Sequence, residues 1–365
     1  MSQLDSERVE RLYGSRWVET AQWYRSSALS VLTGADLRAD LSQQRVRDKI
    51  DADFSATTRQ RAEMCEVMAY GDAGFLLTMP GPSLSGVLIQ ALGDDEQQAV
   101  FRRTVVERRC RTFFAVTEPE RGSDAGNLAT RLTGGRLSGE KLLFGNGAVA
   151  PIGTVLARTG DGPLDTVAVL LLPEMVRSDA VLACGLDMFA MRGARLAHMR
   201  FDRLEVPEHL VLGRHLRAHE RGVMGMVKTF HRFRPGVAAM AIGHAQALVD
   251  YARTHFATAP GLSIRLDSFD HVLACLRALN LAAAAQVDVD PLRGTVVSLT
   301  KSRATRCAEQ VARTLSRELP VGALFEHPWL AKSLSDVFAY EYMEGTTPVH
   351  LENVHHGYLR HELTL

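Results

Sequence analysis

The sequence lacks the features that mark a secreted, membrane-bound or nucleic-acid-binding protein. Its five cysteines are scattered and odd in number, with no CxxC pair, so they predict reduced thiols in a cytoplasmic protein. The first thirty residues carry charges throughout and contain no apolar signal region, and we expect no transmembrane run further along. The 42 basic and 42 acidic side chains cancel, which gives no electrostatic support for nucleic-acid or membrane partners.

A metal site is not expected either. Histidines gather near the C-terminus at His350, His355, His356 and His361. Adjacent histidines on a helix point in different directions, and no carboxylate or cysteine at a suitable spacing completes a ligand set.

What remains is the composition of a globular protein of two or three domains, with 365 residues of which 46% are hydrophobic. Residues 1–112 predict a helical N-terminal domain. Residues 113–215 contain short β-prone runs separated by turns, which predict a small β-barrel or sandwich. Residues 216–365 have apolar residues at helical spacing and predict a four-helix bundle. The expected fold class is therefore α+β, mostly α.

Some elements are predicted individually. Asp94 and Asp95 are candidate caps for a helix over Glu96–Val106, and Ser83–Leu92 has helix-spaced apolar residues. Thr166–Leu172 is apolar on both faces, which predicts a central strand buried on both sides.

The chain is organised around the stretch from Phe113 to Asp124. Its first four residues predict a strand, which Pro119 and Gly122 force to stop and turn. Thr117, Ser123 and the backbone N–H groups around Gly122 then offer hydrogen bonds to an anionic or carbonyl-rich ligand at the strand end. For the isolated segment, a polar loop with capping side chains is an equally good interpretation.

A resemblance decides between these interpretations. The string VTEPERGSD resembles the TEPxAGSD signature of the acyl-CoA dehydrogenase flavoproteins, and four further landmarks follow in that family's order. The first is Gly139-Glu140-Lys141 with Asn146-Gly147, and the second is Arg192-Gly193 with Phe201-Asp202, Val206-Pro207 and Gly213. The third is Phe233-Arg234-Pro235, and the fourth is Met343-Glu344-Gly345-Thr346.

The resemblance implies a flavin enzyme that oxidises the α,β bond of an acyl thioester. Such an enzyme needs a carboxylate that removes the α-proton while the flavin takes the β-hydride from the other side. Glu344 is the implied base, and the Thr-Pro pair that follows it predicts a helix start which pins its loop. A lone loop glutamate is more often only solvated, and some relatives supply the base from another helix.

The resemblance also implies a set of binding residues. Thr117 would bind the flavin pyrimidine edge, Ser123 the pyrophosphate or the pantetheine side, and Thr346 the cofactor phosphates. The other implied FAD-binding residues are Phe114, Val116, Gly122 and Asn146. The implied substrate-binding residues are Ser123, His231, Arg234, Glu344 and Gly345. Two of these roles have equally good alternatives: Phe114 could simply belong to the core of a strand, and Arg234 could form a structural ion pair.

Departures from the family pattern matter as much. Leu143 and Gly145 stand where relatives place Trp and Thr beside the flavin, and residues 255–261 and 317–322 depart from two further cofactor motifs. Each lost charge-assisted bond costs about 1.5–3 kcal/mol, so FAD binding is predicted to be weakened or lost.

His231 stands where relatives that act on coenzyme A place an acidic residue, which favours a carrier-protein thioester and a biosynthetic role. The alternative is an exposed residue at a helix start.

Three hypotheses follow. The first is an FAD-dependent acyl-CoA or acyl-carrier-protein dehydrogenase, with an electron-transfer flavoprotein as a possible acceptor and a homodimer or homotetramer as its assembly. The second is a flavin oxidase or monooxygenase on the same scaffold. The third is a flavin-free relative that binds acyl thioesters without redox chemistry.

Overall fold

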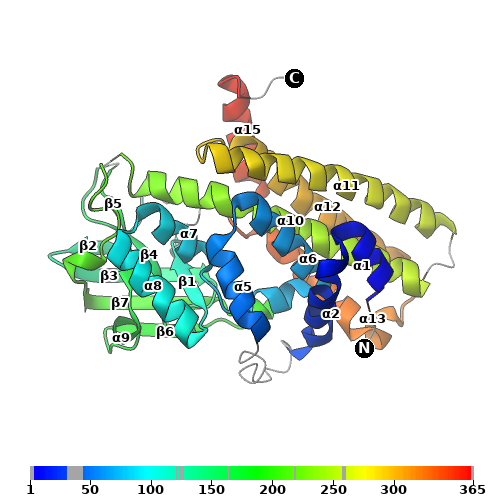
Figure 1. Ribbon diagram of the computed structural model, residues 1–365, viewed down its shortest axis with the longest axis horizontal. Coiled ribbons are helices and arrows are strands. Elements are labelled where there is room, and N and C mark those ends of the chain that lie inside the picture. Colours follow the sequence, from blue (N-terminus) through cyan, green and yellow to red (C-terminus); the bar gives the residue numbers. More distant parts are fainter. Residues whose placement is uncertain are drawn as a thin grey trace.

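The computed structural model describes residues 4–30, 44–120, 122, 127–162, 164–217, 219–256 and 260–362. Helices at both ends of the chain lie beside a single sheet, which is seen at the left of Figure 1. The mostly helical α+β class is confirmed.

The longest N-terminal helix is α6, which spans Thr58–Leu76 and packs against α2 and against the later helices α10 and α11. Two helices begin with a capping box. In this motif the side chain of the N-cap residue accepts from the backbone N–H three residues on, and the side chain of that third helical residue accepts from the N–H of the N-cap residue. Thr57 caps α6 in this way, and Asp94 caps α8. The other helices of this part are α1 (Ser6–Tyr13), α2 (Val18–Ser27), α5 (Gln44–Ser55) and α7 (Ser83–Leu92), and α8 spans Asp95–Arg108.

The middle of the chain forms one seven-stranded mixed sheet. Its strands are β1 (Thr112–Ala115), β2 (Arg131–Thr133), β3 (Arg136–Phe144), β4 (Ile152–Arg158), β5 (Thr166–Leu171), β6 (Val181–Gly185) and β7 (Ala197–Glu205). The order is β1-β4-β2-β3-β7-β6, with β5 paired to β4. The short helix α9 (Pro173–Val176) follows β5.

The described strands do not close into a barrel. Strand β5 is buried along its whole length, as predicted, but it pairs with β4 alone and is not central. Its other side is covered through an isolated bridge between Val169 and Val211. Apolar residues on both faces reflect covered faces, and they carry no information on how many strand neighbours there are.

Three long helices dominate the C-terminal part. They are α10 (Val223–Phe256), α11 (Pro260–Val289) and α12 (Thr295–Glu318), and α15 (Thr347–Leu359) packs against α12. The short helices α13 (Ala323–Glu326) and α14 (Pro328–Asp336) connect α12 to the segment before α15. Helix α10 runs alongside both α6 and α12 and thereby joins the N-terminal helices to the bundle (Figure 1).

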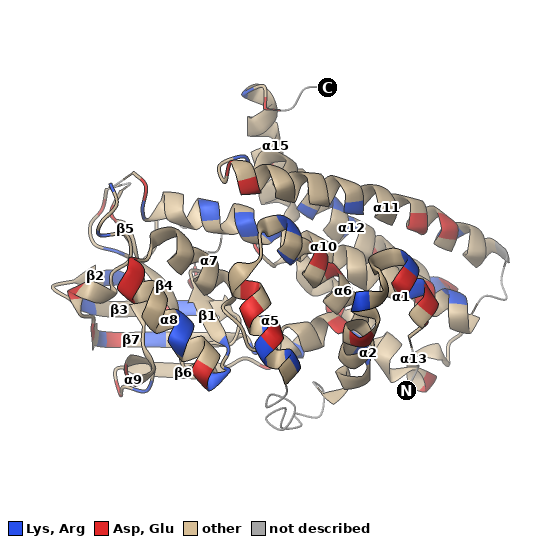
Figure 2. Cartoon of the chain, in the orientation of Figure 1, with Lys and Arg blue, Asp and Glu red and all other residues tan. Residues whose placement is uncertain are grey.

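Helix α11 departs from the expectation that no run is long enough to span a membrane. The segment Gly261–Val289 meets the length criterion with a mean hydropathy of 1.5, and 28% of the apolar window is buried. By length and composition alone this is weak evidence, since helices of soluble bundles pass the same test. Here α11 packs along α10 and α12. Acidic and basic residues are interspersed over the helices, α11 included (Figure 2).

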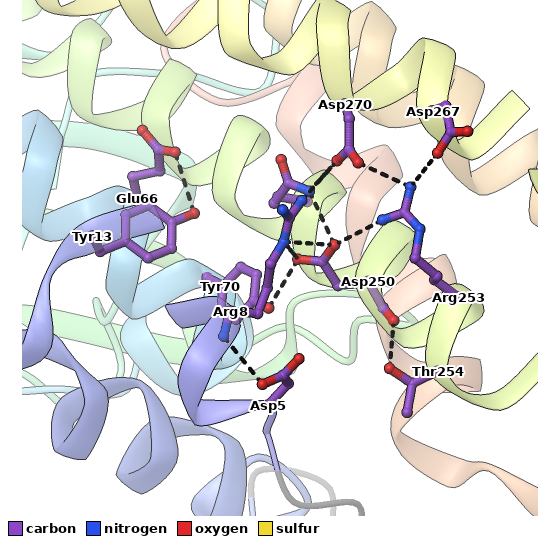
Figure 3. Close-up of polar contacts among 11 residues, drawn as sticks. Asp5, Arg8, Tyr13, Glu66, Tyr70, Asp250, Arg253, Thr254, Asp267 and Asp270 are labelled. Carbon is purple, nitrogen blue, oxygen red and sulfur yellow. Dashed lines mark hydrogen bonds and ion pairs between the residues drawn. The ribbon is translucent and has the colours of Figure 1, made fainter. Parts of the chain in front are cut away.

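A network of charged side chains fixes the first helix to the bundle (Figure 3). Arg8 on α1 donates to Asp250 on α10 at 3.1 Å and to Asp270 on α11 at 3.0 Å. Asp250 also accepts from the Tyr70 hydroxyl of α6 at 3.0 Å, and Arg253 bridges to Asp270 at 2.9 Å. Four helices that are distant in sequence therefore meet through one partly buried network.

A second network is buried and joins all three parts of the chain. Lys332 on α14 lies 2.8 Å from Asp72 and 2.8 Å from Asp336. Asp72 interrupts α6 with extended backbone angles, φ −165° and ψ 119°, and Asp336 accepts the Met191 N–H at 2.5 Å. Because Met191 belongs to the middle segment, this network ties α6, α14 and the sheet connections together.

Candidate active site

A large cavity lies where the three parts of the chain meet. Its volume is about 1570 Å³, and its walls come from α5 to α8, the end of β1, the β3–β4 turn, α10 and the segment before α15. Ligand pockets for drug-sized molecules span roughly 300–1,000 Å³, so this cavity has room for more than one ligand.

Thr117 lies on the cavity wall just after β1. A buried ion pair fixes its neighbours, because Lys141 Nζ donates to the Val116 carbonyl at 2.9 Å and to the Glu118 carboxylate at 2.8 Å. Burial opposes ionisation of Glu118, but Lys141 and the backbone N–H groups of residues 129 and 130 hold its pKa below the usual value. The Thr117 hydroxyl has no hydrogen-bond partner among the described residues and is available to a ligand.

The β3–β4 turn brings Asn146 to the same cavity. Asn146 adopts φ +64°, a left-handed conformation that Asn tolerates better than most residues. Its Oδ1 is buried and has no partner among the described residues. A buried acceptor without a partner is rare in a native protein and marks a position that a ligand can satisfy.

Glu344 also lines this cavity, from the loop before α15. Its backbone is left-handed, with φ +58°, and the next residue, Gly345, has φ +108°. Two cations hold the loop: Arg234 Nε donates to the Glu344 carbonyl at 2.9 Å, and buried Lys301 donates to the Gly345 carbonyl at 2.6 Å. A strained loop persists only where the surroundings fix it, as these bonds do.

The charges around Glu344 set its protonation. Burial raises the pKa of Glu344 to about 7, while Arg234 and Lys301 lower it and so limit the rise. Burial likewise lowers the pKa of Lys301 to about 8 and that of Arg234 to about 10. A carboxylate with a pKa near neutrality suits proton transfer at physiological pH.

The helix start after the base loop is built as predicted, with Thr346 as the N-terminal cap residue and Pro348 in the first turn of α15. The Thr346 hydroxyl does not cap, however. Instead the Glu341 carboxylate accepts from the Thr347 N–H at 2.7 Å and from its hydroxyl at 2.6 Å. The Thr346 side chain is therefore left to face the cavity that it lines.

His231 is neither exposed nor at a helix start, which corrects that interpretation. It lies inside α10, lines the cavity and bonds the Pro291 carbonyl through Nδ1 at 2.9 Å. Burial and then Arg234 lower the pKa of His231 to about 4, so it is neutral at physiological pH. Arg234 makes no ion pair with a described carboxylate and binds the backbone of the base loop instead.

The structure brings the predicted residues together on one cavity. Those that line it are Phe114, Val116, Thr117, Gly122, Asn146, His231, Arg234, Glu344, Gly345 and Thr346. Ser123 lies outside the described residues. Leu143 and Gly145 also line the cavity, as their place in the motif predicts. The described residues include no group of three or more His, Cys, Asp or Glu side chains placed to hold a metal.

Sequence reasoning missed the supports behind this wall. Lys141, Lys301 and Glu341 each bond a backbone group or carboxylate beside a predicted site residue. His350 is fully buried, and a Cβ built on Gly345 would lie 3.2 Å from its Nε2. Lys141 stands inside a quoted motif, where a buried lysine in a strand was a usable signal. Lys301 offered none, since it is one cation on a helix rich in arginine.

Comparison with known families completes the assignment. The model for "Acyl-CoA dehydrogenase, middle domain" matches residues 113–204, and that for "Acyl-CoA dehydrogenase, C-terminal domain" matches residues 220–359. Together the two ranges cover well over half of the chain. The chain belongs to the acyl-CoA dehydrogenase superfamily. It is accordingly an acyl-CoA dehydrogenase-like oxidoreductase.

Individual relatives are distant. A Caenorhabditis briggsae protein described as a medium-chain specific acyl-CoA dehydrogenase, mitochondrial, is 25% identical over 308 residues, which is 80% of this chain and 74% of the relative. A glutaryl-coenzyme A dehydrogenase in complex with glutaryl-CoA superposes with a TM-score of 0.81 at 18% identity, covering 99% of this chain and 97% of the other. A Mycobacterium smegmatis glutaryl-CoA dehydrogenase in complex with FADH2 gives 0.78 at 18% identity, covering 99% of both chains. At such identities the structures show a shared fold.

Proposed function

We propose that this superfamily member is an FAD-dependent dehydrogenase that oxidises the α,β bond of an acyl thioester, with Glu344 as the base. One observation carries the proposal: Thr117, on the sheet side, and Glu344, before the last helix, line the same cavity. Proton and hydride removal from neighbouring carbons requires a base and an acceptor on opposite sides of the substrate.

Glu344 fits the role of base in position and in charge. Its loop is held from behind by Arg234 and Lys301, which bond backbone carbonyls and leave the carboxylate for the cavity. With a pKa of about 7, roughly half of the molecules carry the ionised base at neutral pH. Removal of the α-proton requires that ionised form.

The part of the cavity wall that contains Thr117 and Asn146 fits a flavin. Among the described residues the Thr117 hydroxyl has no partner, and it and the buried Asn146 Oδ1 offer hydrogen-bonding groups to a polar ring edge; no described atom lies within 4 Å of a Cβ built on Gly122. Bound FAD supplies an acceptor for two electrons in the form of a hydride. Leu143, 53% exposed on the cavity wall, and Gly145 provide no side-chain hydrogen bond there, which supports weakened FAD binding.

The thioester's carrier is proposed from His231. A neutral histidine bonded to the chain's own Pro291 gives no charge to recognise the nucleotide end of coenzyme A. We therefore favour a phosphopantetheine arm on a carrier protein and a biosynthetic role, with coenzyme A as the alternative. Five free cysteines support a reducing, cytoplasmic setting. A homodimer or homotetramer that passes electrons to a partner flavoprotein completes the proposal.

The test is α-proton exchange in deuterium oxide. The FAD-loaded protein should exchange the α-proton of a saturated acyl thioester, and Glu344→Gln should lose exchange while its affinity for the thioester is retained. Unchanged exchange in this variant would move the base elsewhere. A colourless protein that also fails to bind added FAD would refute the flavin enzyme and favour the flavin-free alternative.

A second candidate is an oxidase or monooxygenase, which the apolar, half-exposed Leu143 on the cavity wall favours. Following reoxidation of the substrate-reduced protein by oxygen separates the two. Slow reoxidation supports the dehydrogenase, and fast reoxidation supports the second candidate.

A further inference from the structure

Two turns of the middle segment share a costly backbone conformation. At the end of β3, Leu143 and Asn146 have φ of +58° and +64°. Between β6 and β7, Met191 and Arg195 both have φ of +48°. Left-handed backbone at residues other than glycine persists only where the surroundings fix it, and it gathers at functional sites. Four such residues on two turns therefore require a support.

The two turns are bonded to each other beside the cavity. The Asn146 N–H donates to the carbonyls of Ala194 at 2.9 Å and Arg195 at 3.0 Å. The Ala194 N–H in turn donates to the Met191 carbonyl at 2.8 Å. Asn146 belongs, with Thr117, to the part of the cavity wall that suits a flavin, which we call the flavin wall. The turn between β6 and β7 therefore supports the flavin wall.

This second turn rests on α6 and α14. A Cβ built on Gly193 would overlap the Gly74 carbonyl oxygen, so the turn touches α6 with no room for a side chain. On the α14 side, Asp336 Oδ1 accepts the Met191 N–H at 2.5 Å, and Lys332 Nζ holds Oδ2 of the same carboxylate at 2.8 Å. The side chains of Lys332 and Asp336 are each only 4% exposed. The turn is thus fixed by a buried ion pair, where hydrogen bonds are stronger than in water.

Asp336 also begins the segment that carries the base. It is the last residue of α14, and a 3-10 helix, Val337–Glu341, follows it directly. Glu344 comes three residues after this helix. The Tyr340 hydroxyl fixes the helix to α10 by donating to the Met240 carbonyl at 3.2 Å. The side chain of Asp336 therefore holds the support of the flavin wall, while its backbone leads to the base.

We propose that Asp336 is a positioning residue, whose bond to the Met191 N–H sets the distance between the flavin wall and the base Glu344. This inference rests on the proposed function, in which the α-proton goes to Glu344 and the β-hydride to the flavin. Both transfers from one substrate depend on one geometry, and a displacement of about 1 Å can cost a hundredfold in rate. Asp336 does not line this cavity itself and acts through Met191, which does.

The test compares two reactions of one FAD-loaded sample with hexanoyl-CoA in the absence of oxygen. Exchange of the α-proton in deuterium oxide needs the base, whereas bleaching of the flavin needs the base and the flavin in register. The ratio of the bleaching rate to the exchange rate does not depend on the folded fraction of the sample. A loss of stability alone therefore leaves the ratio unchanged.

Two variants of Asp336 separate the bond from the charge. Asp336→Asn keeps an oxygen that can accept the Met191 N–H, and Asp336→Ala removes it. In both variants Lys332 keeps Asp72 as a partner at 2.8 Å. We expect Asp336→Ala to lower the ratio about ten- to a hundredfold and to weaken FAD binding about tenfold. Asp336→Asn should restore both to within about threefold of the unaltered protein.

A third variant displaces the same turn from its other side. Gly193→Ala places a Cβ on the Gly74 carbonyl and leaves Asp336 and Lys332 untouched. The matched control is Gly185→Ala at the end of β6, where the added Cβ meets one described atom within 4 Å, Ala148 Cβ at 3.8 Å. Gly193→Ala should lower the ratio at least tenfold, and the control should leave it unchanged.

The outcomes separate the inference from the proposed function. An unchanged ratio in either Asp336→Ala or Gly193→Ala would overturn the inference. An equal loss in Asp336→Asn and Asp336→Ala would overturn it too, because the charge and not the bond would then matter. FAD affinity, measured by quenching of flavin fluorescence, serves if the unaltered protein neither exchanges nor bleaches with hexanoyl-CoA. In that case the proposed function fails, and weaker FAD binding in Asp336→Ala but not in Asp336→Asn still supports the positioning of the flavin wall.

Discussion

Lys301 provides the sharpest test of how the fold sets the base. Its ammonium is buried and donates to the carbonyls of Gly345 at 2.6 Å and Glu341 at 3.3 Å, on both sides of Glu344. Lys301→Met keeps most of the side-chain volume and removes the charge. The charge favours ionised Glu344, so its loss should raise the pKa of Glu344 above about 7.

The size of this effect follows from Coulomb's law. Two unit charges ~4 Å apart interact by ~4 kcal/mol at an effective dielectric of about 20. The Lys301 ammonium bonds the backbone of the residue next to Glu344 and not the Glu344 carboxylate. We therefore take half of this interaction energy, ~2 kcal/mol. This corresponds to about a 30-fold change in the protonation constant.

The assay is the pH dependence of α-proton exchange. In the unaltered protein, exchange should increase as pH rises through about 7, because Glu344 must lose its proton to act as base. In Lys301→Met the rise should move to higher pH by about 1.5 units, so activity is reduced about 15-fold at pH 7 and recovers in alkaline buffer. Arg303→Met, an exposed change on the same helix, should leave the profile in place.

Two results would refute this reasoning. A profile that keeps its midpoint would show that Lys301 does not act on the charge of the base. Activity that stays low at every pH would show that the lost bonds to the loop matter through position and not through charge.

Three further predictions concern stability. Because burial raises the pKa of Glu344 from 4.5 to about 7, the native state loses stability as pH rises through this range; Glu344→Gln should remove this loss and raise stability at pH 8 by about 3 kcal/mol in chemical denaturation, and an unchanged stability at pH 8 would contradict this. Lys332→Met should cost about 3–5 kcal/mol by leaving its two buried carboxylate partners uncompensated, and an unchanged melting temperature would contradict this. Gly243→Ala should destabilise by about 1–3 kcal/mol, because the added Cβ meets the Glu66 carbonyl where α10 crosses α6. Gly261→Ala, with no described atom within 4 Å of the added Cβ, should be nearly neutral.

The fold was predictable where the signals are local. The helix over Ser83–Leu92 has the predicted bounds, and Asp94 caps α8 through a side-chain bond to the N–H three residues on. The loop-to-helix start at Thr346 is likewise local chemistry. The sheet was predicted less well, because alternating and continuous apolar patterns report which faces are covered and not which strands pair. Strand β5 therefore has the predicted burial and an unpredicted position at an edge.

The sequence by itself determined the motifs that place Thr117 and Glu344, and with them the family. Only the tertiary structure decided that both line one cavity, that Lys301 and Arg234 hold the base loop, and that Asp336 holds the turn at Met191. The reason is physical: the pKa of Glu344 and the bond between Met191 and Asp336 depend on burial and on partners that lie tens to hundreds of residues away. No local pattern of residues encodes those distances.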